Sequence, residues 1–266
     1  MQDFQERILS FYQENKRDLP WRKTTNRYHI MVSEFMLQQT QVSRVIPKYE
    51  AWLEAFPSPS ALAAAPLPQI LQLWQGLGYN NRAKRLQDSC KIIMTEHNGV
   101  VPGSPQELIQ LPGIGPYMAR SIPIFADNLN IATVDTNIRR ILIHEFDLPD
   151  TISDKELQEL ADGLVPQGKS RDWHNALMDY GAKVLTARNS GISPKTKQSK
   201  FEGSTRWYRS QILKLLLKQK RVSVDFIKEQ FSDCPHNLDK IIASMERDGL
   251  LNKYQEVISL VESTTN

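Results

Sequence analysis

The stretch LPGIGPYMAR, residues 111–120, says most about the fold of this chain. Gly113 and Gly115 stand two residues apart, and a proline and a helical pattern follow them. Glycine allows a positive φ and the close approach of another backbone. A turn of this kind between two helices can aim backbone N–H groups at a phosphate, helped by the dipole of the second helix. The stretch therefore predicts either a tight turn between packed helices or a hairpin that holds DNA without reading its bases.

The composition is that of a globular protein. Of the 266 residues, 40% are hydrophobic and 24% are charged, and no apolar run approaches the roughly 18 residues that a membrane span needs. The charged, amphipathic N-terminus argues against a secretory signal, so we expect a cytoplasmic protein. The net charge of +3 permits nucleic-acid binding. Two cysteines and five dispersed histidines predict no metal site.

Apolar residues at helical spacing predict an all-α chain up to about residue 220. The predicted helices are 4–12, 28–56, 67–74, 83–97, 105–111, 117–125, 138–146 and 172–185. A polar, basic segment at 188–205 reads as a surface loop or linker. Three short helices and a hairpin are expected after it, a pattern that resembles a winged-helix module.

Two carboxylates are candidates for acid–base chemistry. Asp135 stands where an apolar run meets a new helix, the position of an N-cap, and a capping aspartate is expected to have a lowered pKa and to stay anionic. Glu34 lies in a largely apolar helical stretch. It either faces solvent or faces a pocket that raises its pKa and makes it a general acid. One protonated and one ionised carboxyl is the pairing that breaks glycosidic bonds.

The hairpin and the trailing VDTN, residues 134–137, resemble the helix–hairpin–helix (HhH-GPD) DNA glycosylase superfamily. Four further stretches are similar to adenine DNA glycosylases of the MutY type: LPWR at 19–22, SEFMLQQTQV at 33–42, LWQGLGY at 73–79 and ALMDYGA at 176–182. The resemblance implies an all-α, two-lobed fold with DNA across the cleft and the target base flipped into a pocket.

The resemblance also implies a division into domains. The glycosylase domain would cover residues 1–202, with a six-helix lobe at about 24–130 and a second lobe made of the N-terminus and 131–202. The small winged-helix-like domain would cover residues 203–266.

Roles for single residues follow from the same resemblance. Glu34 would protonate the departing purine, and Asp135 would stabilise the oxocarbenium-like sugar and help to deliver water. Tyr117 stands where relatives of the endonuclease III type have the lysine of a bifunctional lyase. Because tyrosine cannot form a Schiff base, we expect base excision without efficient strand cleavage.

DNA contacts and a base pocket are implied at further positions. Gln38 and Tyr79 would wedge into the base stack, although ordinary packing is the alternative for both. Arg139 could meet a phosphate, or belong, with Arg140, to a solvated basic face. The expected DNA-binding residues are Gly113, Ile114, Gly115, Gln38, Tyr79 and Arg139, and the expected base-pocket residues are Trp21, Arg22, Asn137 and Asp179.

The chain departs from its relatives in the region that usually binds an iron–sulfur cluster. Four cysteines usually follow ALMDYGA, with six, two and five residues between them. That spacing falls here on Leu185, Ile192, Lys195 and Phe201. Because thiolates hold such clusters, we expect no 4Fe–4S cluster and no other cofactor, and a degenerate cluster loop at 185–202.

A second departure concerns specificity. MutY-type enzymes usually add a Nudix-like domain that checks for 8-oxoguanine, and residues 206–264 are too few for it. Thr136 stands where the adenine enzymes favour glycine, and VDTN is closer to the endonuclease III and thymine-mismatch branches. LVPQGKSRD, residues 164–172, also resembles the thymine-mismatch branch.

These observations lead to one expected function and two alternatives. We expect a monofunctional DNA glycosylase that hydrolyses the N-glycosidic bond of adenine mispaired with guanine or 8-oxoguanine. It would act as a monomer on double-stranded DNA. We expect it in the cytoplasm, associated with the nucleoid and not with a membrane. The alternatives are a thymine or uracil glycosylase acting on mismatches with guanine, and a catalytically silent DNA-binding relative.

Overall fold

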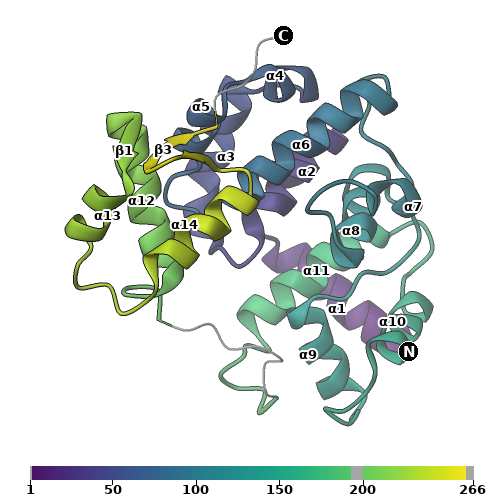
Figure 1. Cartoon of the computed structure of the whole chain (residues 1–266). Coiled ribbons are helices and arrows are strands. Elements are labelled where there is room, and N and C mark those ends of the chain that lie inside the picture. Colours follow the sequence, from purple (N-terminus) through teal and green to yellow (C-terminus); the bar gives the residue numbers. More distant parts are fainter. Residues whose placement is uncertain (1, 193–199, 262–266) are drawn as a thin grey trace. The chain divides into compact units, whose positions relative to one another are not determined.

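The structure is a computed structural model that describes residues 2–192 and 200–261 (Figure 1). The chain divides into two compact units. Unit 1 comprises the described parts of Met1–Glu34 and Pro102–Lys197, and unit 2 those of Phe35–Val101 and Gln198–Asn266. The expected boundaries near residues 24, 130 and 202 stay a prediction.

Unit 1 is helical and is built around one long buried helix. Its elements are α1 (Gln2–Asn15), the 3-10 helix η1 (Pro20–Arg22), the first part of α2 (Arg27–Leu37), α7 (Pro105–Leu108), α8 (Pro116–Asp127), α9 (Thr136–Glu145), α10 (Asp154–Gly163) and α11 (Ser170–Lys183). Helix α11 packs against α1, α8 and α9. Trp173 of α11 is buried and meets Phe4 of α1 edge to face, with ring centroids 5.6 Å apart.

Unit 2 combines a helical part with the C-terminal module. The helical part contains the end of α2, α3 (Val42–Ala55), α4 (Pro59–Ala64), α5 (Leu67–Trp74) and α6 (Asn81–Glu96). Trp52 of α3 and Trp74 of α5 are buried and pack edge to face, with ring centroids 5.3 Å apart. These aromatic side chains fix the packing of α3 against α5.

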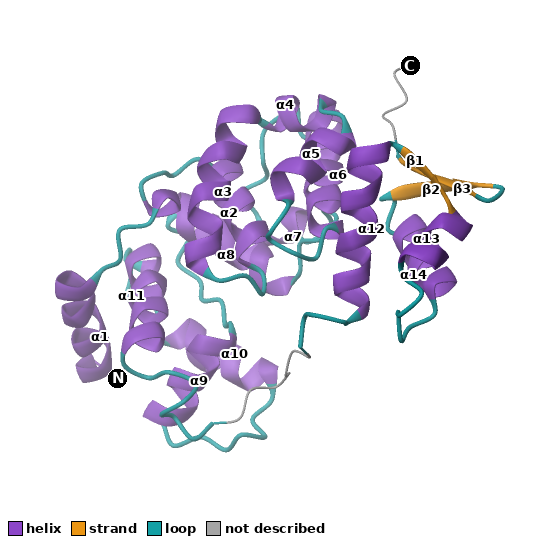
Figure 2. Cartoon of the chain, turned by 90° about the vertical axis from the view of Figure 1, so that its left-hand side faces the viewer, coloured by secondary structure: helices purple, strands orange, loops and turns teal. Residues whose placement is uncertain are grey.

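The C-terminal module has the three helices and the hairpin that the sequence predicts, and Figure 2 shows the strands gathered there. Its elements are α12 (Thr205–Gln219), β1 (Arg221–Ser223), α13 (Val224–Gln230), α14 (Leu238–Arg247), β2 (Leu251–Tyr254) and β3 (Val257–Leu260). Strand β3 lies between β1 and β2 and pairs antiparallel with both. Ser223 caps α13, and Gly249, at φ 67°, follows the end of α14. The module is winged-helix-like, with β1 as a strand that the sequence did not predict.

The predicted helix 28–56 is wrong as a single element. It is divided into α2 and α3 by a turn at residues 38–41, in which Gln39 adopts φ 54°. Two helices, α4 and α10, were missed. Ser58 caps α4, and Ser153 and Glu156 form a capping box at α10. Within the described residues, none of the helices is long and apolar enough to cross a membrane.

Candidate active site

Glu34 is a buried carboxyl at the centre of a small polar cluster in unit 1. It lies on α2 with 7% of its surface exposed, and the neighbouring residues from Ile30 to Met36 are buried as well. The Ser121 hydroxyl donates to its Oε2 at 2.6 Å, and the Tyr117 hydroxyl also hydrogen-bonds to it. Of the two possibilities left by the sequence, the structure shows the buried one.

Tyr117 and Ser121 reach Glu34 because they are one helical turn apart. Residues four apart lie on the same face of a helix, and both belong to α8. Ser121 is fully buried, whereas Tyr117 and Asp135 keep intermediate exposure. The cluster therefore has a buried carboxyl inside and two groups that reach the surface.

Burial sets the protonation state of Glu34. Desolvation raises the pKa of its carboxyl from 4.5 to about 7 and outweighs the hydrogen bonds from Ser121 and Tyr117, which favour the ionised form. The negative charge of Asp135 raises this pKa further. Burial and the same two carboxyl groups raise the pKa of Tyr117 well above its usual value, so its hydroxyl stays protonated.

The expected low pKa of Asp135 is wrong. Its side chain does cap α9, since Oδ1 accepts from Asn137 N at 2.9 Å and from Ile138 N at 2.7 Å. Burial raises its pKa nevertheless, more than these hydrogen bonds and the Arg140 charge lower it. The expected pairing of one protonated and one ionised carboxyl stays a prediction. The two carboxyls are coupled, because the charge of Asp135 raises the pKa of Glu34.

Asn137 orients the carboxylate of Asp135. Its Nδ2 donates to Asp135 Oδ2 at 2.8 Å, and its Oδ1 accepts from Arg140 at 2.8 Å. Arg140 is held in turn by the carbonyls of Gly181 and Leu185. A Cβ at Gly181 would lie 3.2 Å from that of Asn137, so the glycine lets α11 approach this chain of contacts.

The segment before Asp135 is fixed by hydrogen bonds to three helices. Thr133 Oγ1 donates to the Tyr117 carbonyl at 3.1 Å, and Ala132 N donates to Asp162 of α10 at 2.7 Å. Thr133 N donates to Nε2 of His174 at 3.1 Å, and His174 Nδ1 pairs with the Ser170 carbonyl. Burial lowers the pKa of His174 to about 4, so the ring is neutral and can accept at Nε2.

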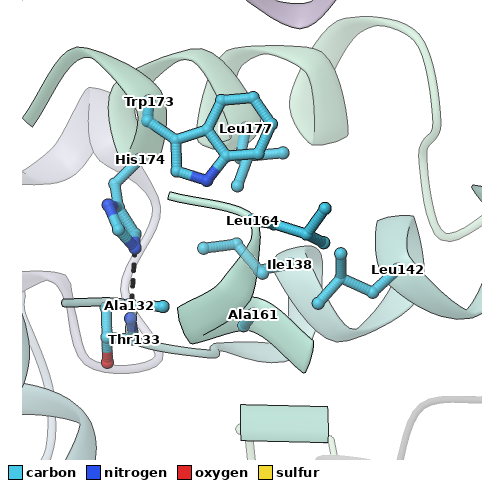
Figure 3. Close-up of a pocket in the computed structure, with 9 residues that line it drawn as sticks. All are labelled: Ala132, Thr133, Ile138, Leu142, Ala161, Leu164, Trp173, His174 and Leu177. Atoms are coloured by element: carbon cyan, nitrogen blue, oxygen red, sulfur yellow. Dashed lines mark hydrogen bonds between the residues drawn. The ribbon is translucent and has the colours of Figure 1, made fainter. Parts of the chain in front are cut away.

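Figure 3 shows the bond between His174 and Thr133 beside an apolar pocket. The pocket is lined mainly by aliphatic side chains and Trp173, and it has no room for a water molecule. It belongs to the packed core that supports the Asp135 segment and is not a ligand site.

The hairpin has one glycine in the left-handed region. Gly113 adopts φ 84°, as the sequence predicts, but Gly115 does not. Gly115 is the N-cap of α8 with φ −97° and ψ 179°, an extended conformation that any residue can adopt. Ile114 is buried, and its N–H donates to the Leu111 carbonyl at 3.1 Å, so it anchors the turn.

In unit 2, one buried arginine holds both loops that carry the expected wedge residues. Nη1 of Arg82 donates to the carbonyls of Phe35 and Gln38 at 2.7 and 2.6 Å. Nη2 donates to the carbonyls of Leu77 and Gly78 at 2.9 and 3.0 Å. The arginine thus caps the C-terminus of α2 and ties the 38–40 turn to the 76–79 loop.

Both loops contain left-handed residues that are not glycine, Gln39 at φ 54° and Tyr79 at φ 46°. Such conformations are strained and persist where the surroundings hold them. Burial lowers the pKa of Arg82 to about 10, which still leaves it charged at neutral pH.

Two of the expected base-pocket residues form a separate clamp. Asp179 is fully buried and accepts from both terminal nitrogens of Arg22 at 2.8 Å. It also accepts from the main-chain N and the Nε of Arg17. This clamp joins η1, with the buried Trp21, to α11.

Arg139 and Arg140 do not form the solvated basic face considered from the sequence. Both are buried, with 7% and 8% of their surface exposed. Arg139 donates to the Asp150 carbonyl at 2.7 Å and is also near the Asp150 carboxylate. The expected phosphate contact of Arg139 is therefore not supported, because its guanidinium fixes the loop after α9.

The cluster-loop residues do not fit an iron–sulfur cluster. Leu185 is a core residue whose carbonyl accepts from Arg140, and Phe201 is 49% exposed. Lys195 lies outside the described residues. Cys90 and Cys234 both belong to unit 2, and burial raises the pKa of Cys90 to about 12, which keeps it a neutral thiol.

Comparison with known proteins agrees with this architecture. The model of the HhH-GPD superfamily of base excision DNA repair proteins matches residues 32–167, which include Glu34, Tyr117 and Asp135. The chain belongs to this superfamily. An adenine DNA glycosylase of Mycolicibacterium smegmatis is 36% identical over 92% of this chain and 92% of its own length.

Further relatives match over a smaller part of their length. An adenine DNA glycosylase of Mycobacterium tuberculosis is 40% identical over 70% of this chain, and the match covers 64% of that relative. The solved structure of a thermostable thymine-DNA glycosylase is 29% identical, with a TM-score of 0.68, over 73% of this chain and 89% of that one.

Ser121, His174 and Arg82, which hold the candidate site or the predicted wedge loops, were not predicted from the sequence. Ser121 could have been found from its spacing of four residues after Tyr117. His174 and Arg82 carry no comparable signal, because their partners are backbone groups that only the folded chain brings together.

Proposed function

We propose that this protein is a monofunctional adenine DNA glycosylase that removes adenine mispaired with guanine or 8-oxoguanine. The observation that carries the proposal is the buried Glu34 carboxyl, which lies near Asp135 and is hydrogen-bonded by the hydroxyls of Ser121 and Tyr117. The adenine DNA glycosylases of two mycobacteria at 36% and 40% identity support the choice of base.

Glu34 is the general acid of the proposed reaction. With a pKa near 7 it is protonated in a substantial fraction of molecules at neutral pH. Its proton passes to the adenine ring as the bond between the base and C1′ of the sugar breaks, so the base leaves neutral. Ser121 and Tyr117 then stabilise the carboxylate that remains.

Asp135 stabilises the positive charge that develops on the sugar. Its bonds to Asn137 and Ile138 fix the carboxylate in place before the reaction, so that no reorganisation is needed. Water adds to C1′ and gives up its proton to a carboxylate, which completes the hydrolysis. Tyr117 offers no amine, so no Schiff base forms and the strand is left intact.

We propose double-stranded DNA with a mispaired base as the partner, bound by one copy of the chain in the nucleoid. The amides around Gly113 would hold the phosphate backbone at the N-terminus of α8. Gln38 and Tyr79 would fill the space left by the flipped base. The strained loops that carry them support this role.

We also propose that the protein works without an iron–sulfur cluster, since the chain has two cysteines and such a cluster needs four ligands. The purified protein should be colourless and contain no stoichiometric iron. Metal analysis of the protein expressed in iron-supplemented medium checks this, and one bound cluster per chain would contradict it.

A second candidate is a thymine or uracil glycosylase that acts opposite guanine. The observation in its favour is the solved thymine-DNA glycosylase, which shares the fold at 29% identity. It would use the same carboxyl pair with a pyrimidine as the leaving base.

Single-turnover base release separates these candidates. The duplexes carry adenine opposite guanine or 8-oxoguanine, and thymine or uracil opposite guanine, with Asp135→Asn as the blank. Adenine release that disappears in the blank supports the proposal. Release of thymine or uracil alone would contradict it and establish the second candidate. Tight binding without release of any base would favour a silent DNA-binding relative.

A further inference from the structure

The C-terminal module touches one of the expected wedge residues. Nη1 of Arg206, in the first turn of α12, donates to the Tyr79 hydroxyl at 2.6 Å. The same guanidinium lies over the Tyr79 ring, 5.2 Å from its centroid. A single side chain of the module thus contacts both the face and the polar tip of this ring.

Residues outside the module also hold Tyr79 and its loop. Arg82 lies 5.6 Å from the ring centroid and bonds the Gly78 carbonyl, which also accepts from Trp74 Nε1 at 3.0 Å. The Tyr79 carbonyl accepts the main-chain N–H of Arg82 at 2.9 Å and so begins α6. The backbone of the loop is therefore fixed by Arg82 and Trp74, while Arg206 contacts the outer end of the side chain.

A second part of the module lies near the start of α6. A Cβ at Gly249, which follows α14, would lie 3.4 Å from Cε of Lys84. Lys84 is in the first turn of α6, five residues after Tyr79. Arg206 and Gly249 come from different parts of the module, so one part contacts Tyr79 in the 76–79 loop and another lies near Lys84.

We propose that Arg206 is a positioning residue for Tyr79, through which the C-terminal module takes part in separating the target base from its partner. The inference rests on the proposed function, because it uses Tyr79 as the residue that enters the base stack. A ring whose orientation is fixed before DNA binds loses less side-chain freedom when it inserts. The module would therefore act by fixing the orientation of the Tyr79 ring, and it would not contact a base itself.

The experiment uses the full chain and a duplex with adenine opposite 8-oxoguanine. A 2-aminopurine next to the adenine reports unstacking by its fluorescence, and base release is followed under single turnover. Arg206→Ala is compared with Lys214→Ala, which removes the same charge from an exposed position of the same helix. Both changes are repeated in Tyr79→Ala protein.

We expect Arg206→Ala to slow unstacking and base release by ~10-fold, equivalent to ~1.4 kcal/mol. Lys214→Ala should stay within ~2-fold of the unchanged protein, the range expected for a distant surface site. In the Tyr79→Ala background, Arg206→Ala should add nothing, because the residue through which it acts is absent. Arg206→Lys, which keeps a donor for the hydroxyl, should recover part of the loss and serves as the test if the alanine variant unfolds.

Two results would overturn the inference. One is an Arg206→Ala protein that behaves like Lys214→Ala. The other is an equal loss with Tyr79 and with Ala at position 79, which would make Arg206 a direct DNA contact. Failure of the proposed function is seen separately, as normal unstacking by the unchanged protein with no adenine released. In that case the 2-aminopurine fluorescence of Arg206→Ala and Lys214→Ala still tests the role of Arg206.

Discussion

Two carboxyl groups of unit 1, Glu34 and Asp179, are buried to nearly the same degree, at 7% and 0% exposure, yet differ in their partners. Asp179 faces the guanidinium groups of Arg22 and Arg17. Glu34 faces the hydroxyls of Ser121 and Tyr117 and the carboxylate of Asp135. Burial raises the pKa of both groups, but the arginines reverse this for Asp179, whose pKa ends below its usual value.

This difference separates a carboxylate that stabilises the fold from a carboxyl that can donate a proton. An ion pair keeps Asp179 charged at all physiological pH values, so it can join η1 to α11 but cannot exchange a proton near neutrality. Hydroxyl donors compensate the charge of Glu34 only in part, and its proton is therefore available at about pH 7. The same isosteric change, carboxyl to amide, should therefore reduce catalysis at Glu34 and reduce stability at Asp179.

The largest expected effect is on catalysis at the Glu34 position. Glu34→Gln removes the proton donor but keeps the shape, so adenine release under single turnover should fall by at least ~10³-fold, or ~4 kcal/mol. Binding to the mismatched duplex should remain, since the change leaves both predicted wedge loops intact. Turnover within ~10-fold of the unchanged protein would remove Glu34 from the mechanism.

The next effect is on stability at the Asp179 position. Asp179→Asn leaves Arg22 and Arg17 without their carboxylate in a buried site, which should cost ~3–5 kcal/mol of unfolding free energy. Urea denaturation at pH 7 measures this, with Glu34→Gln as the matched control that should lose no stability. An Asp179→Asn protein as stable as the control would show that the clamp is not structural.

The two carboxyls should also give stability an opposite dependence on pH. In the unfolded chain Glu34 titrates near 4.5, and in the folded protein it keeps its proton up to about 7. Its contribution is therefore fully present below pH 4.5 and is lost as the pH rises to about 7, by ~3 kcal/mol at ~1.4 kcal/mol for each pH unit. Asp179 has a lowered pKa, so its contribution is present above 3.8 and is lost in acid.

Unfolding free energies of the unchanged protein and of Glu34→Gln, measured between pH 5 and 8, isolate the contribution of Glu34 to the pH dependence of stability. The difference should grow with pH in favour of the glutamine variant. Parallel curves would mean that Glu34 is ionised in the folded protein across this range.

The smallest effect concerns the Ser121 hydroxyl. Because this donor lowers the pKa of Glu34, Ser121→Ala should raise it and extend adenine release to higher pH; such a hydrogen bond is worth ~1 kcal/mol. Ser33→Ala is a suitable control, since that buried hydroxyl bonds the Ile30 carbonyl. A pH profile moved equally by both changes would argue against a specific bond from Ser121.

The sequence predicted the parts of the site that depend on local signals. Asp135 follows an apolar run and caps the next helix, and Tyr117 follows a glycine turn, so both could be placed from a few neighbouring residues. The break between α2 and α3 had no such signal, because glutamine and threonine are compatible with a helix. It depends on Arg82, which is distant in sequence and takes the carbonyls at the end of α2.

Burial was the other property that the sequence did not reveal. Arg139 and Arg140 look like a basic surface, but the fold places both inside. Asp135 has the donors of an ordinary cap, yet desolvation raises its pKa. In both cases the decisive quantity is how much of the side chain the rest of unit 1 covers, which only tertiary packing sets.

An NMR titration of protein labelled with ¹³C-glutamate, assigned by comparison with Glu34→Gln, measures the pKa of the Glu34 carboxyl itself. A parallel titration with ¹³C-aspartate and Asp179→Asn serves as the reference. We expect a midpoint near 7 for Glu34 and one below 3.8 for Asp179. A Glu34 midpoint near 4.5, its ordinary value, would contradict the claim that burial makes this carboxyl the acid.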